Sequence, residues 1–251
     1  MTILSLADVE LHSFHWDNFN PDILASHKKL MAFYGLNVQY TQENIPHGEW
    51  FTRVVSQSTK KVIGIIEPDV IPLTPDIVLQ TAQYVYEYDT FMGCAQVSNH
   101  KHPASHIFAS PAFFFITPPC YAKLGKPSFM PTHRADVAEE LSYKAEEIGI
   151  RYRTLYPTYY EASPPNGVWL LGSYGYYGIG TVFHDSVYHL FQSRNAKNVE
   201  LFVKRVDEVI NQTFSTTNFH CSTSFSTPEK MVKPPKKRAW YKNFISKLKG
   251  K

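Results

Sequence analysis

A short apolar run followed by two acidic residues constrains this chain more than any other feature. Residues Val62–Ile66 read Val-Ile-Gly-Ile-Ile, which is typical of a fully buried β-strand, and Glu67 and Asp69 follow with one residue between them. Alternation along an extended chain predicts that both carboxylates point to the same side. Such paired oxygens suit a hard divalent cation, Mg²⁺ or Mn²⁺, and through it a diphosphate.

Composition excludes several classes of protein. The chain has 251 residues, of which 43% are hydrophobic, enough for one large or two small domains with a real core. No apolar run approaches the roughly 20 residues of a membrane-spanning helix. Residues 1–11 lack a basic region before their apolar stretch, so we expect no cleaved signal. Three widely spaced cysteines match neither a zinc site nor a disulfide framework. These features predict a cytoplasmic protein.

Charge is distributed unevenly along the chain. The formal net charge is +3, but residues 230–251 contain nine Lys or Arg and no acidic residue, which leaves 16 basic against 22 acidic residues in positions 1–229. This asymmetry predicts an acidic domain over residues 1–225, followed by a basic linker and an amphipathic tail over residues 226–251.

The first 90 residues alternate between strand and helix patterns. Asn20 and Pro21 form a helix start signal, and Gly35 ends the same helix. We expect strands at 8–14, 36–40 and 61–66, and helices at 21–34, 47–58 and 74–88. Alternation in this order predicts a mostly parallel, three-layer α/β sheet.

Beyond residue 90 the pattern is less regular. Asp136 and Glu139 form a capping box for a helix that Gly149 ends. A stretch rich in aromatic residues, Pro and Gly predicts an irregular loop over residues 157–180. The other expected elements are strands at 91–97, 112–116 and 151–156, a loop at 100–110, a strand or turn at 181–190, a helix at 198–211 and a linker at 220–235.

The order of five motifs resembles GT-A-fold glycosyltransferases. Residues 67–73 (EPDVIPL) resemble the DXD region of that family, although the first acid is Glu67 rather than Asp and Pro68 follows it. The likeness covers about residues 8–195, and these segments are similar to those of some phage, viral and bacterial members of the family. The other matching segments are residues 47–50 (HGEW), 110–116 (SPAFFFI), 121–129 (YAKLGKPSF) and 188–194 (YHLFQSR).

This resemblance implies a GT-A-like three-layer α/β/α fold with a mixed, mostly parallel central sheet. It implies a metal-dependent transferase that moves a sugar from a UDP- or GDP-sugar to an acceptor glycan or lipid-linked sugar. Asp69, with Glu67, would hold Mn²⁺ or Mg²⁺, which offsets the charge of the departing nucleoside diphosphate. His189 is the preferred third ligand and His184 the other candidate, although either could be an ordinary strand histidine.

The resemblance also implies where the donor and acceptor bind. The end of the first strand, His12, Ser13 and Phe14, would hold the base and ribose, with the base stacked on Phe14 or Trp16. Arg194 would contact the diphosphate. Core packing of the aromatic rings and a surface ion pair of Arg194 are the alternatives.

Asp136 is the candidate catalytic base, if the enzyme inverts the anomeric centre. Its alternative role is that of a helix cap alone. The aromatic residues Trp169, Tyr174, Tyr176 and Tyr177 would suit a sugar acceptor or simply pack beneath a loop. A further group, His100, His102 and His106, has no regular spacing, and we expect solvated loop histidines rather than a zinc site.

Two other functional classes fit part of the pattern. A nucleotidyltransferase also uses paired carboxylates and a metal, but it would usually carry a Gly-rich loop where residues 12–17 read HSFHWD. The second alternative is a non-catalytic module that binds membranes or nucleic acid. Residues 236–251 place five apolar residues on one face of a helix pattern and lysines on the other, which predicts association with an anionic membrane at its cytoplasmic face. Nucleic-acid binding and a purely solubilising role are the alternatives for this tail.

Overall fold

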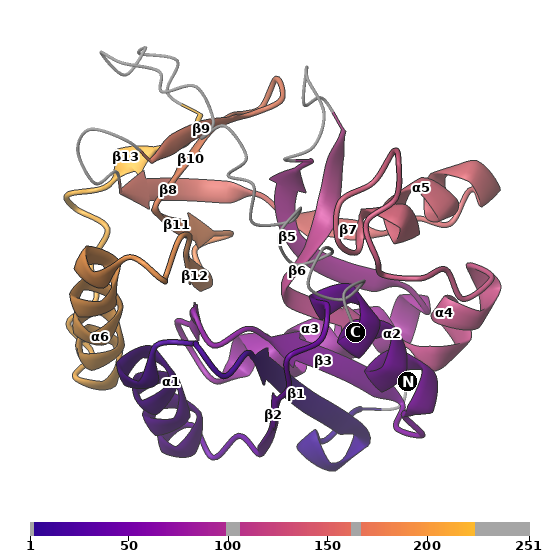
Figure 1. Ribbon diagram of the computed structural model, residues 1–251, viewed down its shortest axis with the longest axis horizontal. Coiled ribbons are helices and arrows are strands. Elements are labelled where there is room, and N and C mark those ends of the chain that lie inside the picture. Colours follow the sequence, from indigo (N-terminus) through magenta and orange to yellow (C-terminus); the bar gives the residue numbers. More distant parts are fainter. Residues whose placement is uncertain (1–2, 99–105, 162–166, 224–251) are drawn as a thin grey trace, which may run out of the picture.

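A mixed six-stranded β-sheet forms the centre of the structure, a computed structural model that describes residues 3–98, 106–161 and 167–223 (Figure 1). Its strands are β1 (Val9–His15), β2 (Val38–Gln42), β3 (Val62–Ile66), β5 (Phe91–Val97), β6 (Ile107–Ile116) and β7 (Arg153–Leu155). The order across the sheet is β2-β1-β3-β6-β5-β7. Only β6 runs antiparallel to its neighbours, and the other three pairings are parallel.

Helices cover both faces of this sheet, as Figure 1 shows. One face packs against α2 (His47–Gln57), α4 (Pro118–Lys123) and α5 (Glu139–Ile148). The opposite face packs against α1 (Pro21–Phe33) and α3 (Asp76–Tyr88), with α6 (Ala196–Ile210) beside α1. The three-layer α/β/α architecture with a mixed, mostly parallel sheet is therefore confirmed.

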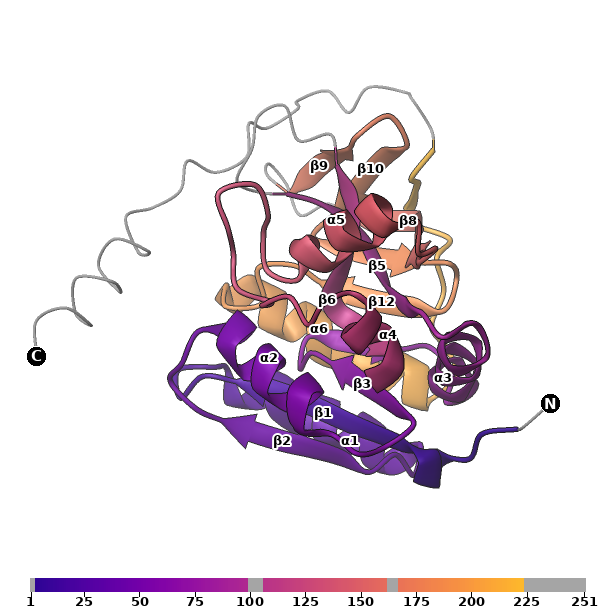
Figure 2. The same cartoon turned by 90° about the vertical axis from the view of Figure 1, so that its right-hand side faces the viewer.

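A second sheet lies against the first. It contains β4 (Val70–Pro72), β8 (Pro157–Glu161), β11 (Gly180–Phe183), β12 (Val187–Leu190) and β13 (His220–Cys221), in the order β13-β8-β11-β12-β4. A separate hairpin consists of β9 (Val168–Leu171) and β10 (Gly175–Gly178). Figure 2 shows this hairpin at the end of the molecule opposite β2. Because β4 follows β3 directly, the second sheet begins where the central strand β3 ends.

The expected irregular loop over residues 157–180 was wrong, since most of its described part is strand. Its aromatic residues favour strands. Its glycines serve close strand contact rather than loop flexibility: a Cβ on Gly178 would lie 2.4 Å from the carbonyl oxygen of Glu161. Residues 181–190 belong to the antiparallel hairpin β11–β12.

Two further boundaries differ from expectation. The helix expected from Asp136 begins at Glu139, after Ala138, which has a left-handed φ of 67°. Asp136 is not its N-cap, because its carboxylate accepts a hydrogen bond from the Val137 amide instead (2.8 Å). Residues 107–110 belong to β6 rather than to a loop. By contrast, Asn20 caps α1 as expected, by accepting from the amides of Asp22 and Ile23.

The basic tail predicted over residues 226–251, including the membrane-binding pattern of 236–251, lies outside the described residues, as do His100 and His102. Within the described ranges, no helix is both long and apolar enough to cross a membrane.

Candidate metal and substrate site

A tight turn at the end of β3 positions the two acidic residues. The amide of Val70 donates to the carbonyl oxygen of Glu67 (3.0 Å), so Glu67 and Asp69 lie in a turn and not in an extended strand. The expected mechanism, alternation along the strand, was therefore wrong. The turn exists because the chain leaves the central sheet here and enters the second sheet as β4.

Strand pairing in the second sheet brings a histidine to these acids. Strand β12 runs antiparallel to β4, with His189 opposite Val70, and the Leu190 amide donates to the Asp69 carbonyl oxygen (3.0 Å). This pairing places the His189 side chain next to Asp69. The other candidate, His184, is exposed in the turn between β11 and β12.

Glu67, Asp69 and His189 form one compact ligand set. One ligand atom from each lies within 4.8 Å of the others, and His189 Nε2 is 3.7 Å from Asp69 Oδ1. Two ligands of one Mg²⁺ ion, each about 2.1 Å from it, are at most about 4.2 Å apart. The 3.7 Å between His189 Nε2 and Asp69 Oδ1 is within this limit. The side chains are 19%, 15% and 8% exposed respectively, so the set is shielded but can be reached from solvent.

An unsatisfied carboxylate oxygen indicates that this set suits a cation. Asp69 Oδ1 is buried without a hydrogen-bond partner among the described residues, and His189 Nε2 is the ring nitrogen that lies next to it. The other carboxylate oxygen, Asp69 Oδ2, accepts a hydrogen bond from Ser193 Oγ (2.8 Å). A buried carboxylate oxygen without a partner is costly. The Ser193 bond orients Asp69 and leaves Oδ1 available as a ligand. Oxygen and imidazole donors of this kind suit Mn²⁺ or Mg²⁺.

Repulsion between the two acids affects the pKa of Glu67. Burial, and then the nearby charge of Asp69, raise the pKa of Glu67 well above its usual value. Burial lowers the pKa of His189, and the Asp69 charge only partly opposes this. At neutral pH His189 is therefore an unprotonated ligand, and a bound cation would relieve the repulsion between Glu67 and Asp69.

His47 lies next to Glu67 at the start of α2. Its Nε2 atom is 3.4 Å from Glu67 Oε1, and its ring is stacked against Phe14 with 5.5 Å between ring centroids. Burial lowers the pKa of His47 to about 4, so His47 is neutral at pH 7 and does not neutralise the acidic pair.

We predict that Mn²⁺ affinity rises with pH above 4.5, the usual pKa of a glutamate, because Glu67 must lose its proton before it can bind the ion. His189 adds little near neutral pH, since its pKa lies below the usual value of 6.5. Glu67→Gln should bind Mn²⁺ more weakly but with a flatter pH dependence. Calorimetric titration of Mn²⁺ at several pH values measures both effects. An equally steep dependence in Glu67→Gln would contradict this assignment.

Ser193→Ala should weaken Mn²⁺ binding by about 10- to 100-fold, the usual cost of losing a hydrogen bond that orients a metal ligand. Ser186→Ala is the matched control, because the Ser186 hydroxyl donates to the His184 carbonyl oxygen within an exposed turn, away from the ligand set. Mn²⁺ titration of both variants, with melting temperatures as a check on folding, tests the role of Ser193. Equal affinities for the two variants would refute it.

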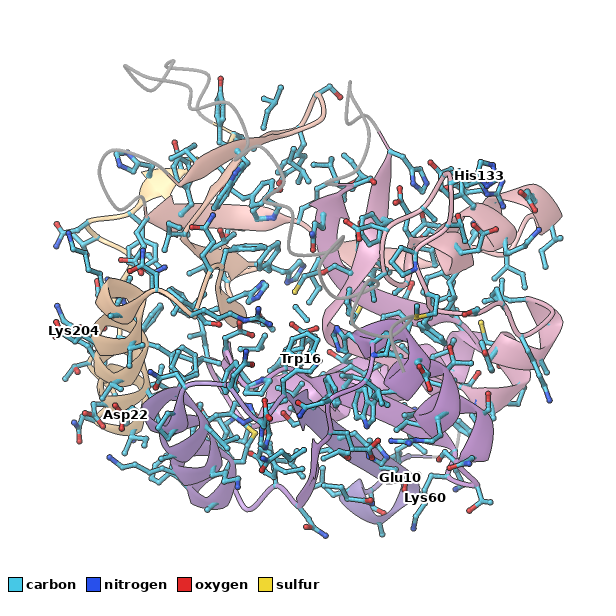
Figure 3. All side chains as sticks on the ribbon, viewed as in Figure 1. Glu10, Trp16, Asp22, Lys60, His133 and Lys204 are labelled. Atoms are coloured by element: carbon cyan, nitrogen blue, oxygen red, sulfur yellow. The ribbon has the colours of Figure 1, made fainter. Side chains whose placement is uncertain are left out.

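Arg194 and Trp16 meet beside the ligand set. The guanidinium carbon of Arg194 is 4.8 Å from the centre of the Trp16 ring, and Trp16 Nε1 donates to the Ile45 carbonyl oxygen (2.9 Å). Figure 3 shows Trp16 near the middle of the molecule, beyond the end of β1. A cation and an aromatic face from opposite ends of the chain thus come together at the carboxyl edge of the central sheet, where α/β sheets usually bind ligands.

His12, Ser13 and Phe14 lie at the end of β1, as expected, but all three are buried. Phe14 packs between core rings, with its centroid 5.0 Å from that of Trp50. Of the two aromatic residues suggested for base stacking, Trp16 is the one that is partly exposed. The role of this strand end in holding base and ribose stays a prediction.

Asp136 lies in the loop before α5, near an aromatic wall that begins at His189. The His189 ring packs on Phe191 (4.1 Å between centroids), and Phe191 packs on Tyr177 (5.3 Å). Burial, and then the charge of Asp136, raise the pKa of Tyr177. The charge of the Asp136 carboxylate therefore acts on the Tyr177 hydroxyl. The role of Asp136 as catalytic base stays a prediction.

Sequence reasoning did not identify Ser193, His47 or Phe191 as parts of the site. Ser193 and His47 occur inside motifs that resemble the glycosyltransferase family, but nothing in their spacing indicates contact with Asp69 or Glu67. Phe191 lies in the same motif as Ser193, residues 188–194, and carries no other sequence signal.

Comparison with known proteins leaves the family open. No protein-family model and no curated protein sequence matches the chain. Among solved structures, the bifunctional IspDF from Campylobacter jejuni is 9% identical, with a TM-score of 0.38 over 59% of this chain, which spans about half (49%) of that protein. A CMP:2-keto-3-deoxy-manno-octonic acid synthetase complexed with CTP is 10% identical (TM-score 0.36; 59% and 89% of the two chains). A glycosyltransferase involved in glycosylation of the major capsid of PBCV-1 is 11% identical (TM-score 0.37; 59% and 81%). Likeness at these TM-scores transfers no activity to this chain.

Proposed function

We propose that this protein is a metal-dependent glycosyltransferase that moves a sugar from a nucleoside-diphosphate sugar to a hydroxyl of an acceptor glycan or glycolipid. The observation that carries this proposal is the convergence of Glu67, Asp69 and His189 at the carboxyl end of β3. A shielded cation site at this edge suits a diphosphate better than it suits an uncharged ligand.

Each side chain of the site has a distinct role in this proposal. Glu67, Asp69 and His189 would hold Mn²⁺ or Mg²⁺, which when bound stabilises negative charge on the leaving diphosphate. Arg194 contacts the diphosphate through its planar guanidinium group, and Trp16 offers a stacking surface to the base. Asp136 accepts the proton of the acceptor hydroxyl in an inverting reaction.

The basic tail suggests where the acceptor is found. Residues 236–251 combine lysines with Trp240, Tyr241 and Phe244, which suits an anionic membrane surface. A lipid-linked acceptor at the cytoplasmic face of a membrane would be consistent with such a tail.

A donor screen tests the function. We expect one UDP- or GDP-sugar to raise the melting temperature of the full chain in the presence of Mn²⁺ and not with EDTA. Incubation with that donor and an acceptor glycan or glycolipid should transfer the sugar to the acceptor hydroxyl and release the nucleoside diphosphate. Release of pyrophosphate from a nucleoside triphosphate and a sugar phosphate would show a nucleotidyltransferase instead. Binding to anionic liposomes without any nucleotide response would show a non-catalytic module.

A further inference from the structure

The carboxylate of Glu139 is fully buried and connects two parts of the chain. Its exposed fraction is 0%, and it lies at the first position of α5. Oε1 is 2.7 Å from Nδ1 of His106, which precedes β6, and Oε2 accepts a hydrogen bond from the backbone amide of Asp136 (2.6 Å). One buried carboxylate therefore holds a histidine with one oxygen and the backbone of Asp136 with the other.

The surroundings of His106 require both of its ring nitrogens to donate. Nε2 lies 3.1 Å from Glu146 Oε1, so each ring nitrogen faces a carboxylate oxygen. Ionised carboxylates only accept hydrogen bonds, and only the protonated imidazolium offers two N–H donors. The ring also packs flat on Tyr143, with 3.9 Å between centroids. The geometry thus selects the charged form of His106.

The turn that carries Asp136 has an uncommon backbone conformation and is held by contacts with other segments. Ala138 has a left-handed φ of 67°, which residues with a Cβ rarely adopt. Within this turn, the Val137 amide donates to Asp136 Oδ1 (2.8 Å), and the Ala138 amide donates to the carbonyl oxygen of Phe129 (3.0 Å). The hydrogen bond to Glu139, and through it the contact with His106, ties this turn to the start of β6.

We propose that Glu139 and His106 are positioning residues for the catalytic base: the charged imidazolium holds the buried carboxylate, and the carboxylate holds Asp136 towards the substrate site. This inference rests on the proposed function for its effect on sugar transfer. The structural half, that His106 controls the order of the Asp136 turn, is independent of that function.

The interaction between the His106 ring and the Glu139 carboxylate depends on pH in a defined direction. Burial alone would lower the pKa of His106, but its hydrogen bonds to Glu139 and Glu146 outweigh burial and raise the pKa above the usual value. The charged form is therefore favoured by these contacts, and the charge is lost as pH rises through this raised value. The charged and titratable groups around the ring, among the described residues, are Glu139, Glu146, Tyr143, Tyr152, which donates to Glu146, and Arg134, which lies over the Tyr143 ring.

Hydrogen exchange of the full chain tests the structural half without any substrate. The amide of Asp136 should be protected at pH 7. We expect this protection, relative to the intrinsic exchange rate at each pH, to fall at least tenfold as pH rises through the His106 pKa. His106→Gln should show the reduced protection already at pH 7. His133→Gln is the matched control, because His133 is exposed in the same loop, at the outer edge of the molecule in Figure 3.

Kinetics test the catalytic half. With the donor found in the screen, His106→Gln and Glu139→Gln should lower kcat about 10- to 100-fold, the usual cost of a misplaced group, while Mn²⁺-dependent donor binding stays within twofold. The decline of wild-type kcat at alkaline pH should disappear in His106→Gln. If Glu139→Gln does not fold, the His106 variant and the wild-type pH series still decide the question.

Each outcome has a single meaning. Unchanged Asp136 protection in His106→Gln, or an equal loss in His133→Gln, overturns the positioning role. Reduced protection together with unchanged kcat shows that the pair orders the turn but that Asp136 is not the base, which overturns the proposal as stated. Reduced protection in a protein that turns over no nucleotide sugar supports the structural half and refutes the proposed function alone.

Discussion

Asp69→Asn should abolish Mn²⁺-dependent stabilisation by the nucleotide sugar and lower kcat/KM by at least about 100-fold, the scale on which loss of transition-state charge stabilisation is felt. Asn keeps the shape of the side chain and can still accept the hydrogen bond from Ser193, which is 2.8 Å from Asp69 Oδ2. What it loses is the negative charge at the buried oxygen 3.7 Å from His189. Thermal shift and steady-state kinetics, with and without Mn²⁺, measure both effects.

Asp185→Asn provides the matched control for this substitution. Asp185 is exposed in the turn between β11 and β12 and has a left-handed φ of 54°, which Asn adopts as readily as Asp. We expect it to leave donor binding and kinetics unchanged. If Asp69→Asn kept both its folded structure and its response to Mn²⁺, the proposed metal site would be wrong.

Arg205→Met should destabilise the protein by about 3–5 kcal/mol, the range for breaking a buried ion pair from one side. Arg205 on α6 binds both carboxylate oxygens of Glu161 on β8, at 3.3 and 2.5 Å. The two side chains are only 12% and 16% exposed. Removal of the guanidinium would leave the Glu161 charge shielded from water, with the Tyr188 hydroxyl as its remaining partner among the described residues (2.7 Å). Urea unfolding followed by circular dichroism gives the free energy of unfolding.

Lys204→Met is the control for Arg205→Met. Lys204 neighbours Arg205 on the same helix, and its side chain is 65% exposed and forms an ion pair with Glu208 at 3.8 Å. Figure 3 shows it on the outer side of α6. An exposed pair of this kind contributes less than about 1 kcal/mol. Similar losses of stability in both variants would show that the Glu161–Arg205 pair does not anchor the second sheet to α6.

The local part of the structure could be predicted because it depends on periodic patterns. Residues 62–66 form a strand and residues 47–57 a helix, close to the expected bounds, since their apolar residues repeat with the period of the element. The error at residues 157–180 has the opposite cause. Glycine predicts a loop there, whereas Gly178 is needed because a neighbouring strand passes too close for a Cβ.

The start of α5 also depends on a contact with a distant segment that local sequence spacing cannot predict. Asp136 and Glu139 have the spacing of a capping box, and Glu139 does reach back to the Asp136 amide. The helix nevertheless begins at Glu139, because His106 binds the same carboxylate from a distant segment and Ala138 takes a left-handed conformation. Sequence spacing identified the hydrogen-bonded pair, but it could not reveal the third member.

The sequence by itself determined that a buried strand ends in Glu67 and Asp69, since strand formation and the order of neighbouring residues are local properties. It also singled out His189 through a motif. Only the tertiary structure decided that these three side chains converge and that Ser193, 124 positions after Asp69, orients its carboxylate. The physical reason is that β4 pairs with β12 across the sequence, and hydrogen bonds between distant strands depend on the packing of the whole second sheet rather than on any local pattern.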